Sequence, residues 1–153
     1  MRSAAVLLAV VLLPFAFIVA AHAASPASYV GSKACAECHQ KEHASFNKFA
    51  KKAHSFKSIQ VMAPKLEAAE LRECYSCHTT GYGQPGGFVS VEKTPELANA
   101  GCEVCHGPGS EHVQTGDKSL IKTKPKVEEC QTCHNEQRVK SFGFKPMLFG
   151  GAH

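Results

Sequence analysis

The chain has 153 residues, a formal net charge of +4, 44% hydrophobic residues and no tryptophan. Much of the apolar content lies in the first 23 residues, and the part that follows is long enough for a single domain. This composition excludes a large hydrophobic core built from the polypeptide alone.

The N-terminus predicts export. Arg2 precedes an uncharged apolar run from Ala4 to Ala21, and Ala21-His22-Ala23 offers a cleavage site of the small-x-small type. Residues 1–23 are therefore interpreted as a secretory signal peptide, which leaves residues 24–153 as the mature domain. An uncleaved membrane anchor is the alternative, because a spanning helix needs about twenty apolar residues.

The charge of the mature chain bears on its partners. Removing Arg2 leaves 16 Lys and Arg residues against 13 Asp and Glu residues, a net charge of +3. Most lysines are expected to lie on solvated faces, with an acidic redox protein as an alternative partner. Nucleic acid is not expected as a partner of an exported chain.

Helices and loops are expected to alternate along the mature chain. Phe46, Phe49 and Ala50 recur at helical spacing, and Pro64 can occupy the first turn of a helix. The sequence predicts helices over Ala34 to about Ser55, Pro64 into Cys74, and Val127 to about Lys140. Between them, the glycine-rich stretch from Thr79 to Asn99 predicts a loop with a short extended piece at Phe88 to Val91. The tail after residue 141 is expected to be irregular.

One short motif accounts for every cysteine in the chain. Cys-x-x-Cys-His occurs four times, as Cys35-Ala-Glu-Cys38-His39, Cys74-Tyr-Ser-Cys77-His78, Cys102-Glu-Val-Cys105-His106 and Cys130-Gln-Thr-Cys133-His134. This is the attachment signal for c-type haem, in which two thiols form thioethers to the porphyrin and the His binds the iron. The pattern predicts four covalently bound haem c groups, which would provide most of the core of so small a domain.

Two other uses of paired cysteines compete with this interpretation. Paired Cys-x-x-Cys units can form zinc sites with eight thiolates, and an even cysteine count suits a disulfide framework in an exported protein. Neither alternative needs a His directly after each cysteine pair.

Four further histidines match the four expected irons in number. Outside the motifs, the mature chain contains His43, His54, His112 and His153. A low-spin c-type haem needs a sixth ligand, and neutral imidazole is a common one. Met62 and Met147 are alternative sixth ligands, but methionine is ordinarily a filler of hydrophobic cores.

Sequence spacing restricts which haem two of these histidines serve. His39 and His43 are four residues apart and share a face if the segment is helical, so they cannot approach one iron from opposite sides. His43 is therefore expected to serve another haem or none. His112 follows His106 across the bend Gly107-Pro108-Gly109, which favours ligation of a neighbouring haem by His112.

Three stretches resemble a known family. The sequences "YVGSKACAECHQKEHASFNKFAKKAHSF", "CYSCHTTGYGQPGG" and "GCEVCHGPGSEHV" are similar to the tetrahaem cytochrome c-554 family. These proteins are periplasmic electron carriers, and the best-known members accept electrons from hydroxylamine oxidoreductase. The resemblance implies a mainly α fold with extensive irregular loops around haems packed in parallel-stacked and perpendicular pairs.

The resemblance also implies a ligand set. It suggests that His54 ligates the third haem, His112 the first, and a late histidine, here His153, the fourth. The second haem of the family's type member lacks a sixth ligand. This sequence departs from that pattern in offering His43, in a shorter loop at the third haem and in a much shorter tail, and we expect His43 to close the second site.

From these observations we expect an electron carrier rather than an enzyme. It would transfer electrons between redox partner proteins in the periplasm. Two alternatives remain open. A five-coordinate second haem would allow a small reductase of nitric oxide, nitrite or hydroxylamine. If His153 ligates a haem in the next subunit, the chain could self-associate into an extracellular filament.

Overall fold

The structure is a computed structural model and describes residues 26–135. The predicted signal peptide, the end of the last predicted helix, the tail, Met147 and His153 lie outside the described residues. Between residues 26 and 135 the chain is helical, with irregular loops and no β-strand, so the expected mainly α fold is confirmed. Its elements are α1 Ser32–Cys35, α2 Gln40–Phe49, η1 Lys51–His54, α3 Phe56–Met62, η2 Ala63–Lys65, α4 Ala68–His78, η3 Pro95–Leu97, α5 Glu103–His106, α6 Ser110–Thr115, η4 Lys118–Leu120 and α7 Val127–Gln131.

The first predicted helix is interrupted twice. His39 has φ −104° and ψ 51°, outside the helical region, and Ala50 is extended with φ −84° and ψ 113°. The segment from Ala34 to Ser55 is therefore divided into the end of α1, the separate helix α2 and the short turn η1. The first break falls within the first Cys-x-x-Cys-His motif, which makes its own tight turn.

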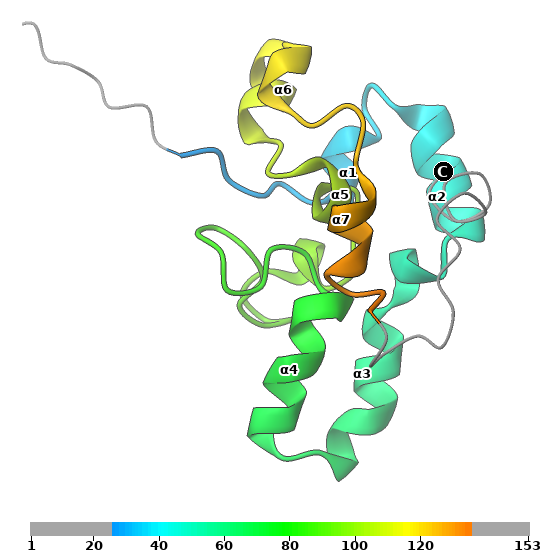
Figure 1. Cartoon of the computed structure of the whole chain (residues 1–153), viewed down its shortest axis with the longest axis vertical. Coiled ribbons are helices and arrows are strands. Elements are labelled where there is room, and N and C mark those ends of the chain that lie inside the picture. Colours follow the sequence, from blue (N-terminus) through cyan, green and yellow to red (C-terminus); the bar gives the residue numbers. More distant parts are fainter. Residues whose placement is uncertain (1–25, 136–153) are drawn as a thin grey trace, which may run out of the picture.

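The second predicted helix begins later than expected, and the helix before it was not predicted. Pro64 starts only η2, because Leu66 is extended with φ −114° and ψ 142°. The helix restarts at Ala68, where the carboxylate of Glu70 accepts a hydrogen bond of 2.9 Å from the backbone N–H of Glu67. Figure 1 shows α3 and α4 as an antiparallel pair joined by this break.

The stretch from Thr79 to Asn99 is a loop, as predicted, but it supplies much of the core. Phe88, Leu97 and Ala98 are buried together, and four partly buried aromatic rings pack against them, those of Tyr29, Phe56, Tyr75 and Tyr82. The expected extended piece at Phe88 to Val91 does not pair as a strand. Phe88 donates its backbone N–H to the carbonyl of Thr80, at 2.9 Å, without a continuing ladder.

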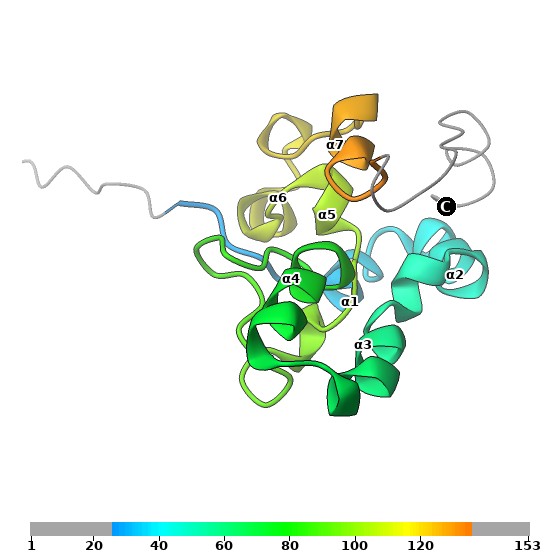
Figure 2. The ribbon, with the colours of Figure 1, turned by 60° about the horizontal axis from the view of Figure 1, so that its bottom comes forward.

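The N-terminal segment of the described chain lies along α5 and α6. Ser28 donates its N–H to the hydroxyl of Ser110 at 2.8 Å, and Ser110 returns a backbone bond to Ser28 at 3.1 Å. The hydroxyl of Ser32 accepts the N–H of Cys102 at 3.0 Å. Two views place α7 beside α5, so the third and fourth motifs are neighbours (Figures 1 and 2).

The buried apolar set is small. Among the described residues it contains eight: Phe46, Ala50, Ala53, Ile59, Phe88, Leu97, Ala98 and Ala100. Four of the eight are alanines. A core of this size buries little side-chain area, as the composition indicated. A search of residues 26–135 finds no helix with the length and apolar character needed to span a bilayer.

Candidate functional site

Each Cys-x-x-Cys-His motif forms one helical turn. The His N–H donates to the carbonyl of the first cysteine in the motif in three cases, and the second motif lies within α4. The distances are 2.8 Å from His39 to Cys35, 3.1 Å from His106 to Cys102 and 2.8 Å from His134 to Cys130. Residues at i, i+3 and i+4 of a helical turn share a face, so both thiols and the imidazole point to the same side. This is the placement that attachment to a porphyrin and ligation of its iron require.

All eight cysteines are free thiols in the structure. The structure contains none of the disulfide bonds considered above. The part of the chain that the structure describes also brings no three His, Cys, Asp or Glu side chains together in a ready-made metal site.

Thiols of different motifs lie close together in pairs. A hydrogen bond from the Cys35 thiol lowers the pKa of Cys102, and the same contact raises the pKa of Cys35. These two thiols join the first motif to the third.

The fourth motif adjoins two others. Burial, together with the neighbouring Cys77 of the second motif, raises the pKa of Cys133 to about 11. Burial also raises the pKa of Cys105, and Cys130 adds to the rise. The attachment sites therefore adjoin one another in the order first, third, fourth and second.

Two motif histidines are oriented by backbone carbonyls. Nδ1 of His78 lies 3.0 Å from the carbonyl of Ser55, and Nδ1 of His106 lies 2.6 Å from the carbonyl of Lys122. A carbonyl can only accept, so Nδ1 carries the proton and Nε2 keeps its lone pair. Metal-bound histidines are commonly held in this way, because the second hydrogen bond fixes both the tautomer and the ring.

The structure brings His39 of the first motif and His112 of α6 together. Their ring centres are 6.3 Å apart and their planes are inclined at 25°. His112 Nδ1 donates to the carbonyl of Asp117 at 2.9 Å, which leaves Nε2 as the available ligand atom. Metal–nitrogen bonds of about 2 Å put each ring centre about 3 Å from a shared metal, so rings on opposite sides have centres about 6 Å apart. The separation of the two ring centres therefore matches that of two imidazoles on opposite sides of one iron.

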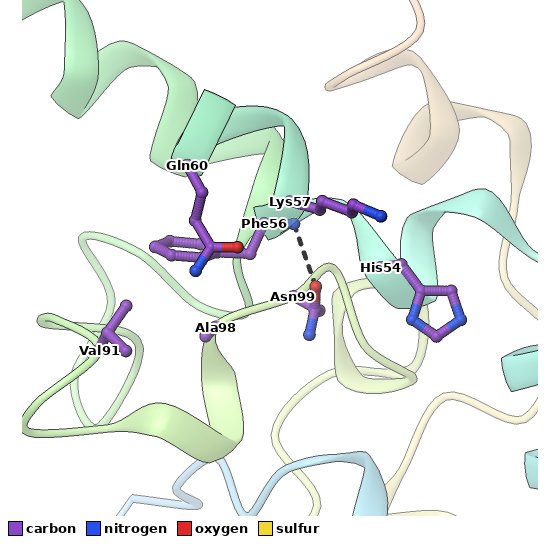
Figure 3. Close-up of a pocket in the computed structure, with 7 residues that line it drawn as sticks. All are labelled: His54, Phe56, Lys57, Gln60, Val91, Ala98 and Asn99. Atoms are coloured by element: carbon purple, nitrogen blue, oxygen red, sulfur yellow. Dashed lines mark hydrogen bonds between the residues drawn. The ribbon is translucent and has the colours of Figure 1, made fainter. Parts of the chain in front are cut away.

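His54 lies at the edge of a cavity of about 570 Å³ between the start of α3 and the loop around Asn99. Figure 3 shows Phe56 and Gln60 on one side of this cavity, with the His54 ring at the other end. The Asn99 side chain fixes the wall by accepting the N–H of Phe56 at 3.0 Å. The size is that of a site for a small molecule or part of a cofactor. His54 Nε2 donates to the Asn47 carbonyl at 2.9 Å, so Nδ1 holds its free lone pair.

His43 lies in α2, and Asn47 covers its ring. The Asn47 amide nitrogen lies 3.2 Å from Nδ1 and 3.0 Å from Nε2 of His43. The charge of His43 also contributes to lowering the pKa of Cys102, after the larger effects of Cys35, Ser32 and His106. The structure thus relates His43 to the third motif through this electrostatic contact. To bind a metal, the ring must release Asn47.

Three further predicted ligands are His134, Met62 and His153. His134 of the fourth motif is half-buried, and burial lowers its pKa, with a smaller contribution from the charge of Lys52. Met62 is 47% exposed at the end of α3. His153 lies outside the described residues.

Sequence reasoning missed the groups that hold these histidines. Ser55, Lys122 and Asp117 act through backbone carbonyls, which leave no signature in a sequence. Glu103 occupies a variable position of the third motif, which assigns it no role. Its position between the motif's two cysteines was visible, but nothing in the sequence indicated its burial.

Comparisons with known proteins agree with this geometry. The family described as "Cytochrome c554 and c-prime" matches residues 34–107. Cytochrome c-554 of Nitrosomonas europaea is 30% identical over 140 residues, covering 72% of this chain, and the chain spans 59% of that relative's length. The structure of reduced cytochrome c554 from Nitrosomonas europaea has the same fold, with a TM-score of 0.58 and 22% identity over 84% of this chain and 86% of that one. Together with the four attachment motifs, these likenesses establish that the chain belongs to the tetrahaem cytochrome c-554 family, whose cofactor is haem c.

Proposed function

We propose that this chain is an exported tetrahaem cytochrome that carries electrons between redox partner proteins through mostly bis-histidine haems, without substrate chemistry of its own. Membership of the family supports the general part of this proposal, that the chain is a c-type cytochrome involved in electron transfer. The observation that supports bis-histidine ligation is the closeness of His39 to His112, which comes from a helix distant in the sequence.

Each cofactor would be held by one motif and one further imidazole. The cysteine pairs would form the thioethers, and His39, His78, His106 and His134 would each bind the iron of their own motif's haem. We assign His112 to the first haem and His54 to the third, and retain His43 for the second and His153 for the fourth. Haem c, when bound, supplies one-electron Fe(II)/Fe(III) chemistry.

The protein's own contribution is spacing and orientation. The thiols of Cys35 and Cys102, of Cys105 and Cys130, and of Cys77 and Cys133 are electrostatic neighbours. Such contacts favour a continuous series of four attachment sites rather than four isolated ones. A continuous series suits a carrier that receives an electron at one surface and delivers it at another.

The proposed location is the periplasm. Export rests on the predicted signal peptide over residues 1–23, and the mature domain would be residues 24–153. A basic segment in α2 and η1 offers a docking surface for an acidic redox protein, with Lys48 and Lys51 exposed and Lys52 half-buried. The Lys48 ammonium lies 5.0 Å from the centre of the exposed Phe49 ring.

Intact mass spectrometry of the secreted protein, combined with thiol alkylation, tests the proposal. We expect the mass of the chain from residue 24 plus four haem groups, and no alkylated cysteine. A secreted species with fewer haems and reactive thiols would overturn the tetrahaem assignment. Retention of residues 1–23 would instead overturn the cleaved signal and favour a membrane anchor.

A further inference from the structure

Glu103 is an acidic side chain in the interior of the third attachment motif. It is the first residue of α5, between Cys102 and Cys105, and only 2% of its surface is exposed. Carboxylates are rarely buried to this degree unless hydrogen bonds compensate for the lost hydration. The contacts of Glu103 therefore indicate what the residue is for.

Three backbone N–H groups converge on the Glu103 carboxylate, two from a distant N-terminal segment and one from Gly109, six residues further along the chain. Oε1 accepts from Gly109 at 2.8 Å and from Val30 at 3.0 Å. Oε2 accepts from Gly31 at 2.8 Å and from Val30 at 3.2 Å. Hydrogen bonds to an ionised acceptor are the stronger kind, so this carboxylate holds both segments firmly.

Each held segment leads directly into one half of the His39–His112 pair. Val30 and Gly31 immediately precede α1, which opens the first motif and its His39. Gly109 immediately precedes α6, which carries His112. Figure 1 shows the N-terminal segment running past α5 and α6, where these bonds are made.

The site is built for a carboxylate rather than for a general polar side chain. Three donors need an acceptor with two oxygens and no hydrogen of its own, and an amide would turn its NH₂ group toward at least one of them. The packing is also close, because a methyl group added at Gly109 would lie 3.2 Å from Oε1. Gly31 has φ +81°, a conformation that disfavours other residues at this contact.

We propose that Glu103 is a positioning residue for the first haem, although it lies in the motif of the third. Its carboxylate fixes the distance and the relative inclination of His39 and His112, and so sets the ligand field of the iron between them. This inference rests on the proposed assignment of His112 to the first haem.

Low-temperature EPR of the oxidised holoprotein tests the inference, because low-spin signals respond to the inclination of two axial imidazoles. The signal of the first haem is identified as the one that His112→Ala removes. In Glu103→Gln we expect this signal to shift, or to be replaced by a high-spin one, while the other three remain unchanged. The midpoint potential assigned to the same haem should shift as well.

Glu37→Gln is the matched control. Glu37 is also a spacer residue of an attachment motif, that of the first haem itself, but it is exposed and the structure gives its carboxylate no hydrogen bond. The same chemical change there should leave all four signals at their native positions.

Gly109→Ala keeps the test decisive if Glu103→Gln does not mature. Gly109 has a negative φ of −104°, so alanine at this position does not need a left-handed backbone, and the variant keeps the Glu103 carboxylate. The added methyl group displaces only the contact with Oε1, and the first-haem signal should shift by less than in Glu103→Gln. An unchanged first-haem signal in whichever variant matures would overturn the inference.

The test separates this inference from the function on which it rests. If His112→Ala removes no low-spin signal, the proposed ligand pairing is wrong. If His112→Ala removes one signal and that signal is native in Glu103→Gln, the pairing stands and the role of Glu103 is wrong.

Discussion

His39 and His112 lie with their ring centres 6.3 Å apart, although they are 73 residues apart in the sequence. One ring belongs to an attachment motif and the other to the helix that follows the next-but-one motif. The Nδ1–H of His112 donates to the Asp117 carbonyl, so Nε2 is the ring nitrogen left to bind a metal. The contact between these two rings brings the first motif next to α6, although the two are far apart in the sequence.

Replacing His112 by alanine should leave one iron without its sixth ligand. Because His112 is assigned as the sixth ligand of the first haem, we expect His112→Ala to convert one of four low-spin haems to a high-spin haem that binds cyanide. EPR and optical titration with cyanide measure this. Gln114→Ala, an exposed change in the same helix, is the control and should leave four low-spin haems. Four low-spin haems in His112→Ala would remove His112 from the ligand set.

Replacing His43 by alanine separates the carrier from a reductase. With His43 assigned to the second haem, we expect His43→Ala to turn one low-spin haem high-spin and open it to nitric oxide, while the other three are unaltered. The unmutated protein should bind no nitric oxide. A high-spin haem that already binds nitric oxide in the native protein would favour the reductase alternative.

His54→Ala is the companion variant, since Asn47 contacts both histidines. Its side chain donates to the ring of His43 and its carbonyl accepts from His54. We expect His54→Ala to open the third haem, which is a different one from that opened by His43→Ala. If both variants open the same haem, the assignment of His43 to the second haem and of His54 to the third is wrong.

The sequence was most informative where the chemistry depends on short spacing. Cys-x-x-Cys-His places its three functional groups within one helical turn, so the four motifs predict the attachment residues without knowledge of the fold. The loop from Thr79 to Asn99 could also be predicted, because its glycines and prolines act locally. The helix from Pro64 could not, since the extended Leu66 and the hydrogen bond from Glu67 to Glu70 set its start.

Contacts over long sequence separations could not be predicted. The carbonyls of Ser55 and Lys122 orient His78 and His106 from 23 and 16 residues away, and every residue type carries such a carbonyl. The burial of Glu103 likewise depends on Val30 and Gly31, 73 and 72 residues away. Only the folded chain brings these donors and acceptors together.

The sixth ligands also predict the redox potentials. Imidazole in place of thioether lowers the potential of a c-type haem, so all four midpoints should lie well below those of His/Met cytochromes. Met62, 47% exposed, is not expected to bind iron, and Met62→Leu should leave every midpoint unchanged in a spectroelectrochemical titration. A high midpoint that falls in Met62→Leu would make Met62 a ligand and contradict the histidine assignment.

Because the polypeptide core is small, a single cavity in it should lower the free energy of unfolding markedly. Leu97 is 1% exposed and packs with Phe88 and Ala98 under the aromatic rings of α3 and α4. Leu97→Ala should lower the free energy of unfolding of the holoprotein by about 2–5 kcal/mol, the usual cost of removing a buried leucine side chain. Val89→Ala, at a position 55% exposed, is the control and should cost less than about 0.5 kcal/mol. Guanidinium unfolding followed by far-UV circular dichroism measures both. Equal stability of the two variants would mean that this loop cluster does not support the fold, leaving the haems and their ligands to hold it together.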